Sequence, residues 1–171
     1  PVLHRRYPKL QLHLREGDPG ELETGLRKGG FDFIMTVLPM HSTENRVRPL
    51  FMEPIKVLVS PEHALAGQTH ITGQELQGQT VLSIDEHFHL QRQITGLCER
   101  FGAQLKRDFE GNSLDTLCQM VMMNQGIAFL PALFAQNELH KGTGLKVLNL
   151  RDETVVRNHV AAWRINSSSR H

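Results

Sequence analysis

The hydrophobic positions of this chain alternate between the period of a strand and the period of a helix. Leu10, Leu12 and Leu14 alternate with polar residues, which predicts a half-buried strand. The apolar run 31–38 predicts a strand that is covered on both faces. Later segments predict strands at 55–60, 80–84, 107–110, 127–130, 145–150 and 159–165, and helices that start near 19, 73, 90, 113 and 132. This order is typical of an α/β fold with mostly parallel sheets.

Residues that favour the start or the end of a helix occur at several positions. Asp18-Pro19 predicts a helix start, because aspartate caps the first turn and proline fits its first position. Gly29-Gly30 predicts the end of that helix. Asn112 or Ser113 predicts a second cap, before a helix whose apolar face repeats at helical spacing. Gly126 then permits a sharp turn into a buried strand.

Four short motifs occur in the order found in a known family. The central stretch is Gly-Asn-Ser-Leu-Asp-Thr-Leu followed by Gly-Ile-Ala-Phe-Leu-Pro, at residues 111–117 and 126–131. The others are Arg-Tyr-Pro-Lys-Leu at 6–10, Phe-Asp-Phe-Ile at 31–34 and Pro-Leu-Phe-Met-Glu-Pro at 49–54. Together they resemble LysR-type transcriptional regulators over nearly the whole chain. The resemblance implies the effector-sensing domain of a DNA-binding regulator.

The same resemblance implies two Rossmann-like lobes of the periplasmic-binding-protein type, with a ligand cleft between them. We expect lobe I to comprise residues 1–54 plus 152–171, and lobe II to comprise 55–151. The first crossing between the lobes is predicted near 53–56, with the strand 145–150 as the candidate for the second. Compared with the family, lobe I is expected to lack a first strand, a last helix and the preceding helix-turn-helix.

Candidate ligand-binding residues follow from the rule that open α/β sheets bind ligands at the carboxyl ends of their strands. They are Thr36, Val37, Ser83, His87, His89, Asn112, Ser113, Gly126 and Ile127. Hydroxyl, amide and free backbone N–H groups suit a small carboxylate or a similar anion. Each residue also has an ordinary structural interpretation; Ser113, for example, can be a cap and nothing more.

Composition and charge narrow the class of protein. With 39% hydrophobic and 22% charged residues, the chain has the make-up of a globular domain. The formal net charge is +1, so the basic surplus of a DNA-binding domain is missing. DNA binding is therefore expected only through a helix-turn-helix domain that this chain does not carry. The sequence has no apolar run near 18 residues, so no membrane contact is expected.

The two cysteines, Cys98 and Cys118, are too few for a secreted disulfide framework, which favours the reducing cytoplasm. Residues 90–98, 112–117 and 130–133 resemble the peroxide sensors of the LysR family. In those sensors a peroxidatic cysteine precedes a second cysteine by nine residues. Cys98 matches the second position, but His89 stands at the first. Cys98 is the redox candidate, although it also suits the apolar face of its helix.

Other candidate chemistry is weaker. His87, His89 and Cys98 supply three metal ligands without a defined fourth, so solvated histidines are favoured over a zinc site. Met120, Met122 and Met123 suit adaptable core packing better than an oxidation switch. The sequence contains no G-x-S-x-G, phosphate-loop or H-E-x-x-H pattern. We therefore expect no enzyme activity, no metal and no cofactor.

The leading hypothesis is an effector-sensing regulatory domain that binds a small anionic ligand between its lobes and changes the arrangement of an oligomer. A homodimer or homotetramer is expected, because the family's sensing domains pair antiparallel through the helix after Asp18 and the helix from Leu90. Three alternatives remain open: an oxidant-sensing regulator domain, a solute-binding protein of the transport type, and an enzyme on the same fold.

Overall fold

The computed structural model describes residues 5–42, 44–83, 89–106 and 113–165. Within these ranges the α-helices are α2 (Pro19–Arg27), α3 (His89–Phe101), α4 (Leu114–Met122) and α5 (Ala132–His140), and η1 (Gly73–Leu76) is a 3-10 helix. The strands are β1 (Phe33–Val37), β2 (Asn45–Val59), β3 (His70–Ile71), β4 (Thr80–Leu82), β5 (Gln104–Lys106), β6 (Ile127–Pro131), β7 (Lys146–Leu150) and β8 (Val156–Arg164).

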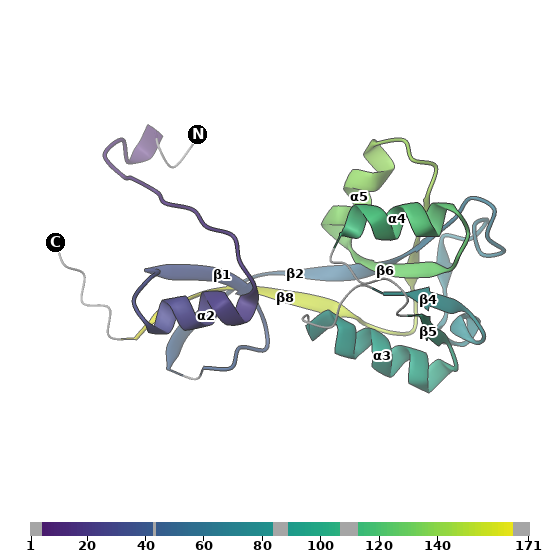
Figure 1. Cartoon of the computed structure of the whole chain (residues 1–171), viewed down its shortest axis with the longest axis horizontal. Coiled ribbons are helices and arrows are strands. Elements are labelled where there is room, and N and C mark those ends of the chain that lie inside the picture. The colour runs from purple at the N-terminus through teal and green to yellow at the C-terminus, as the bar shows by residue number, and fades with distance from the viewer. Residues whose placement is uncertain (1–4, 43, 84–88, 107–112, 166–171) are drawn as a thin grey trace.

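The fold has two lobes joined by a narrow waist, through which β2 and β8 run side by side (Figure 1). The main sheet has the order β1-β8-β2-β6-β4-β5. The prediction of mostly parallel sheets is wrong: β2 is antiparallel to β6, β7 and β8, and β1 is antiparallel to β8. Among the described strands, the parallel pairs are β3–β7, β4–β5 and β4–β6. The two long crossing strands set this pattern, because each pairs antiparallel with neighbours on both of its edges.

The crossing strands differ from the prediction in two ways. β2 is one continuous strand through Pro49 and Pro54, where the sequence predicts a break, and its register against β8 shifts between Pro49 and Phe51. The second crossing strand is β8 and not the segment 145–150, which forms β7 and pairs with β2 and β3. We propose lobe I as residues 1–54 plus 152–171 and lobe II as 55–151, so that the lobes meet inside β2 and just before β8.

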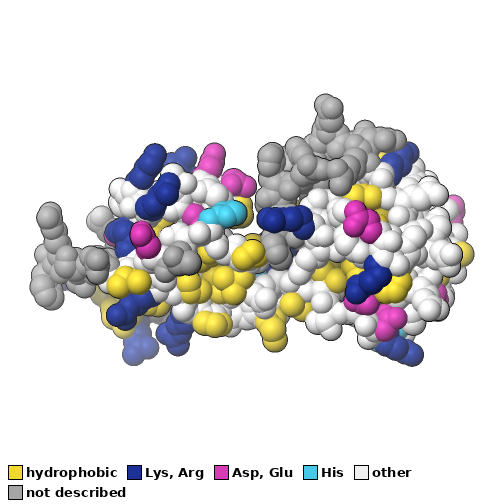
Figure 2. Space-filling view, turned by 90° about the horizontal axis from the view of Figure 1, so that it is seen from below, with side chains coloured by type: hydrophobic (Ala, Val, Ile, Leu, Met, Phe, Trp, Pro, Cys, Tyr) yellow, Lys and Arg dark blue, Asp and Glu magenta, His cyan; other side chains and the backbone are white. Residues whose placement is uncertain are grey.

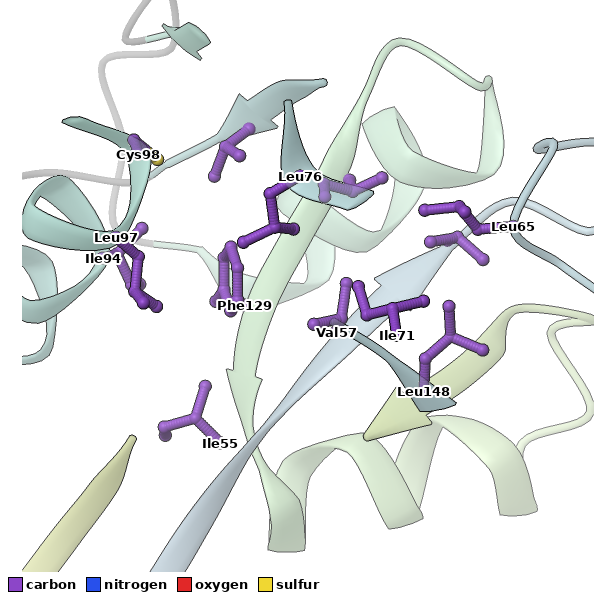
Figure 3. Close-up of a cluster of buried hydrophobic side chains, with 13 residues drawn as sticks. Ile55, Val57, Leu65, Ile71, Leu76, Ile94, Leu97, Cys98, Phe129 and Leu148 are labelled. Carbon is purple, nitrogen blue, oxygen red and sulfur yellow. The ribbon is translucent and has the colours of Figure 1, made fainter. Parts of the chain in front are cut away.

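Lobe II, the larger lobe, buries apolar side chains on both faces of its sheet. Val57, Val81 and Phe129 point to the face covered by α3, where Ile94 and Leu97 complete a cluster (Figure 3). Their sequence neighbours on β2, β4 and β6 point to the other face, under α4 and α5: Leu58, Leu82, Ala128 and Leu130. This alternation is the period-two rule for strands, and it makes the sheet a partition between two separate cores.

In lobe I, the smaller lobe, the sheet is covered by a helix on one face. Leu26 of α2 packs with Ile34 and Ala162. Phe33 and Met35 of β1 are 53% and 61% exposed, so the prediction of a strand covered on both faces is wrong. Figure 2 shows hydrophobic side chains at the surface from this lobe into the waist.

The segment Leu10–Leu14 forms no strand, although its alternation predicts one. Leu10, Leu12 and Leu14 are 42%, 50% and 88% exposed. A strand needs a neighbour for its backbone N–H and C=O groups, and none of the described strands pairs with this segment. Alternation therefore identified a segment able to form a strand but not the partner it requires.

The helix-start predictions are confirmed. Asp18 caps α2 by accepting from the N–H groups of Gly20 at 2.8 Å and Glu21 at 3.4 Å. Ser113 caps α4 by accepting from the N–H of Thr116 at 3.3 Å. The turn after α4 differs from expectation, because Asn124, with φ 56°, takes the left-handed conformation instead of Gly126. Gly126 is needed for space: a Cβ there would lie 2.6 Å from the carbonyl oxygen of Thr80.

We expect Gly126→Ala to destabilise the chain by about 1–3 kcal/mol, the usual effect of overpacking a core. The backbone of β4 cannot move away without disturbing its pairing with β5 and β6. Urea denaturation measures the change, with Gly67→Ala as control, because a Cβ at Gly67 meets nothing within 4 Å. Equal stability of the two variants would contradict this account of Gly126.

Candidate functional site

The candidate site lies at the waist, toward which β1 of one lobe and β4 of the other point with their carboxyl ends (Figure 1). β4 and β5 are parallel neighbours, so Ser83, which follows β4, and Lys106, which ends β5, lie at the same edge of the sheet. β1 ends at Val37, and the N–H of Leu38 donates to the carbonyl oxygen of Asn158 on β8 at 2.9 Å. Strand ends of both lobes therefore point toward the waist, and the carboxyl ends of strands are where open α/β sheets bind ligands.

Ser83 lies at the start of this edge in lobe II. Its residue is 7% exposed, its hydroxyl donates to Oε1 of Gln91 on α3, and its N–H donates to the carbonyl oxygen of Lys106 at 3.3 Å. Gln91 is also 7% exposed, and its Nε2 has no hydrogen-bond partner within the described structure. A buried amide that lacks a partner costs free energy. This N–H2 group is therefore a donor for a small ligand or for water.

The helix starts at this edge supply further donors. α3 begins at His89 and α4 at Leu114, directly after its cap Ser113. Free N–H groups in the first turn of a helix and the helix dipole favour an anion there. His87 and Asn112 lie outside the described residues, and the side chain of His89 is not described.

In lobe I, Thr36 and Val37 end β1. Thr36 is 7% exposed, and its hydroxyl has no partner in the described part of the chain. Val37 is half-buried and pairs with His159 of β8. These two residues are therefore at the waist end of lobe I.

Gly126 and Ile127 do not join this group. They lie at the amino end of β6, level with Thr80 and Val81 at the start of β4, whereas Ser83 follows the far end of β4. Ile127 is fully buried in the core under α3. These two candidates therefore lie at the opposite end of β4 from Ser83.

Glu53 is a buried polar residue of the waist that is not among the candidates from the sequence. This carboxylate is 4% exposed on β2, in the waist. Its Oε2 is 2.7 Å from Nε2 of His159 and accepts from Nη1 of Arg157 at 3.5 Å. Its Oε1 accepts from the N–H of Leu133 on α5 at 3.1 Å. The sequence feature that could have identified Glu53 is its position as the single acidic residue in the run Leu50–Val59, which is otherwise apolar apart from Lys56.

The two cysteines are free thiols in different cores. Cys98 is on the buried face of α3 beside Ile94 and Leu97 (Figure 3), and Cys118 is on the buried face of α4, which covers the opposite face of the sheet. Burial raises the pKa of Cys98 to about 11 and that of Cys118 to about 12. Neither thiol forms the thiolate that reacts with oxidants at neutral pH.

Two further features concern metals and membranes. The described residues contain no group of three or more His, Cys, Asp or Glu side chains placed to hold a metal ion. The histidine pair at 87 and 89 falls partly outside these residues. No helix in the described ranges has both the length and the apolar character needed to cross a membrane.

Comparison with known proteins places the chain in a family. The LysR substrate binding domain matches residues 1–170. The "Hydrogen peroxide-inducible genes activator" of Pectobacterium carotovorum subsp. carotovorum is 33% identical over 138 residues, which cover 81% of this chain and 46% of that protein. The "DNA-binding transcriptional dual regulator OxyR" of Escherichia coli is 32% identical over 133 residues, covering 78% of this chain and 44% of that protein.

Solved structures give the same result. The crystal structure of the oxidized form of OxyR superimposes with a TM-score of 0.82 and 30% identity, over 98% of this chain and 79% of that one. The chain spans about half the length of the two regulators above. The match with the family over nearly every residue, together with the two-lobed fold, leads to one conclusion: this chain belongs to the LysR substrate-binding domain family.

Proposed function

We propose that this chain is the effector-sensing domain of a LysR-type transcription regulator and that it binds a small anionic molecule at the waist between its lobes. The observation that carries the proposal is the buried Nε2 of Gln91 beside Ser83, at the strand edge where α3 and α4 begin, which has no hydrogen-bond partner among the described residues. This amide and the N-terminal N–H groups of the two helices lie at the same end of the sheet, and each favours a negatively charged oxygen. In lobe I the hydroxyl of Thr36 likewise has no partner within the part of the chain that the structure describes.

Effector binding between two lobes changes their relative orientation only if the effector binds one orientation more tightly. The exposed apolar side chains of β1 and β2, including Phe33, Met35 and Met52, suit burial against a second copy. We therefore include a homodimer or homotetramer in the proposal, with DNA bound through a helix-turn-helix domain outside this chain. The relatives are named as regulators and not as enzymes, which supports a non-enzymatic role.

Oxidant sensing is the second candidate function, and the specific observation in its favour is the similarity to regulators named for hydrogen peroxide. The two buried thiols do not support sensing through a disulfide between them, because both pKa values are raised well above neutral pH. If this chain responds to peroxide, the response must use another route.

A thermal-shift screen tests the main proposal, since a specific ligand raises the unfolding midpoint by mass action. The probes are phosphate, sulfate and a panel of small carboxylates, each tested against an uncharged analogue. We expect at least one anion to raise the midpoint while its analogue does not. No shift with any anion, or equal shifts with both members of every pair, would contradict the proposal.

With an anion from that screen, we expect Ser113→Ala and Asn112→Ala to lose most of the midpoint shift. Loss of the Ser113 cap alone destabilises the chain by about 1 kcal/mol. Asp18→Ala is the matched control, because it removes a helix cap of the same kind from α2, in lobe I. The pocket assignment is wrong if the ligand-induced shift survives in both variants, or if Asp18→Ala reduces it equally.

A further inference from the structure

The buried carboxylate of Glu53 connects its own strand, β2, to two other segments, β8 and α5. It stands on β2, it contacts Arg157 and His159 of β8, and it accepts from the N–H of Leu133 near the start of α5. β8 is paired with β1 in the sheet of lobe I, whereas α5 packs on the core of lobe II. One side chain therefore connects elements of both lobes.

The contact with α5 replaces a cap that the helix lacks. Pro131 stands at the N-cap position of α5 and makes no side-chain hydrogen bond to the first turn. Oε1 of Glu53 accepts from the first turn instead, at 3.1 Å from the N–H of Leu133. A carboxylate at a helix N-terminus is also favoured by the helix dipole. The start of α5 thus depends on a residue of the crossing strand.

The contact with β8 is held in place by stacking. The rings of His159 and Phe51 lie 4.4 Å apart at an angle of 15°. This orientation presents Nε2 of His159 to Oε2 of Glu53 at 2.7 Å, and Arg157 adds a positive charge at 3.5 Å. Because the carboxylate is 4% exposed, water competes little for these bonds.

We propose that Glu53 is the positioning residue that fixes the orientation of lobe II relative to the sheet of lobe I. β2 and β8 alone form a narrow two-stranded ribbon, which twists and bends easily. The Glu53 carboxylate adds a third connection, from that ribbon to α5. This role does not depend on the identity of the effector.

The test measures the distance between the lobes in the 171-residue chain. Spin labels are attached at Arg27→Cys on α2 and Gln119→Cys on α4, two exposed positions, while both native cysteines are buried. Double electron–electron resonance then gives the distance distribution between the labels. We expect Glu53→Gln to broaden this distribution and shift its mean. We expect His159→Phe, which keeps an aromatic ring on Phe51 but removes the donor, to do the same.

Glu138→Gln is the matched control. Glu138 is 3% exposed and accepts from Lys141 at 2.6 Å, so it is an equally buried carboxylate whose cation partner lies in the same lobe. Its distribution should match that of the parent chain. A parent-like distribution in both Glu53→Gln and His159→Phe would overturn the proposal, as would equal broadening in Glu138→Gln. If Glu53→Gln fails to fold by circular dichroism, His159→Phe decides the question.

Discussion

Hydrogen peroxide at one equivalent leaves no disulfide between Cys98 and Cys118 in the folded chain; this is the expected result of the most decisive experiment on this domain. A disulfide requires Cα atoms within roughly 7 Å. The two cysteines belong to cores on opposite faces of one sheet, so the strands β4 and β6 separate them. Both thiols are also protonated at neutral pH, because burial raises each pKa.

Mass spectrometry of peptide digests measures this outcome. The control is the same oxidation in denaturant, where the chain is unfolded and a linked peptide should form, which shows that the assay detects it. A linked peptide that forms rapidly in the folded chain, and that a thiol reductant removes, would contradict the arrangement of the two cores. It would also restore a disulfide switch as the sensing mechanism.

We expect the chain to lose stability steeply as the pH rises from about 9, because both thiols must ionise when it unfolds. The pKa values in the folded state, about 11 for Cys98 and about 12 for Cys118, lie above the ordinary value of 9.0. Each raised pKa favours the folded state below pH 9 and ceases to do so as the pH approaches the folded value. At 1.36 kcal/mol per pKa unit, each thiol contributes roughly 2–4 kcal/mol.

Urea denaturation at about pH 8 and about pH 10.5 measures this loss, since the two values lie on either side of the thiol pKa of an unfolded chain. Lysine and tyrosine side chains also titrate in this range, so the comparison requires a matched variant. Cys98→Ala with Cys118→Ala keeps every other titrating group and should lose distinctly less stability over the same interval. An identical loss in both proteins would mean that the thiols are accessible to hydroxide in the folded state.

The membership of the LysR family came from the order of short motifs, and the structure and relatives agree with it. Helices were the most predictable elements. Asp18-Pro19 located the start of α2, Ser113 located that of α4, and the apolar spacing from Leu90 to Phe101 located α3. These signals depend on contacts within one or two turns, so the local sequence contains all that they need.

Strand pairing was less predictable for a physical reason. Alternation at residues 10–14 and the apolar run at 31–38 show that a segment can form a strand, but its neighbour is chosen elsewhere in the chain. The same limit explains why β8, and not 145–150, is the second crossing strand. Several of the candidate ligand-binding residues do lie at strand ends in the waist, whereas Gly126 and Ile127 lie at the other end of their sheet.

The family, the helices with their caps, and the lack of a cysteine nine residues before Cys98 all follow from the sequence. The tertiary structure alone decided which face of the sheet each cysteine occupies, why Gly126 must lack a side chain, and what Glu53 contacts. Glu53 and His159 are 106 residues apart in the chain. Contacts at such separation depend on how the whole backbone packs, and no local pattern of residues specifies them.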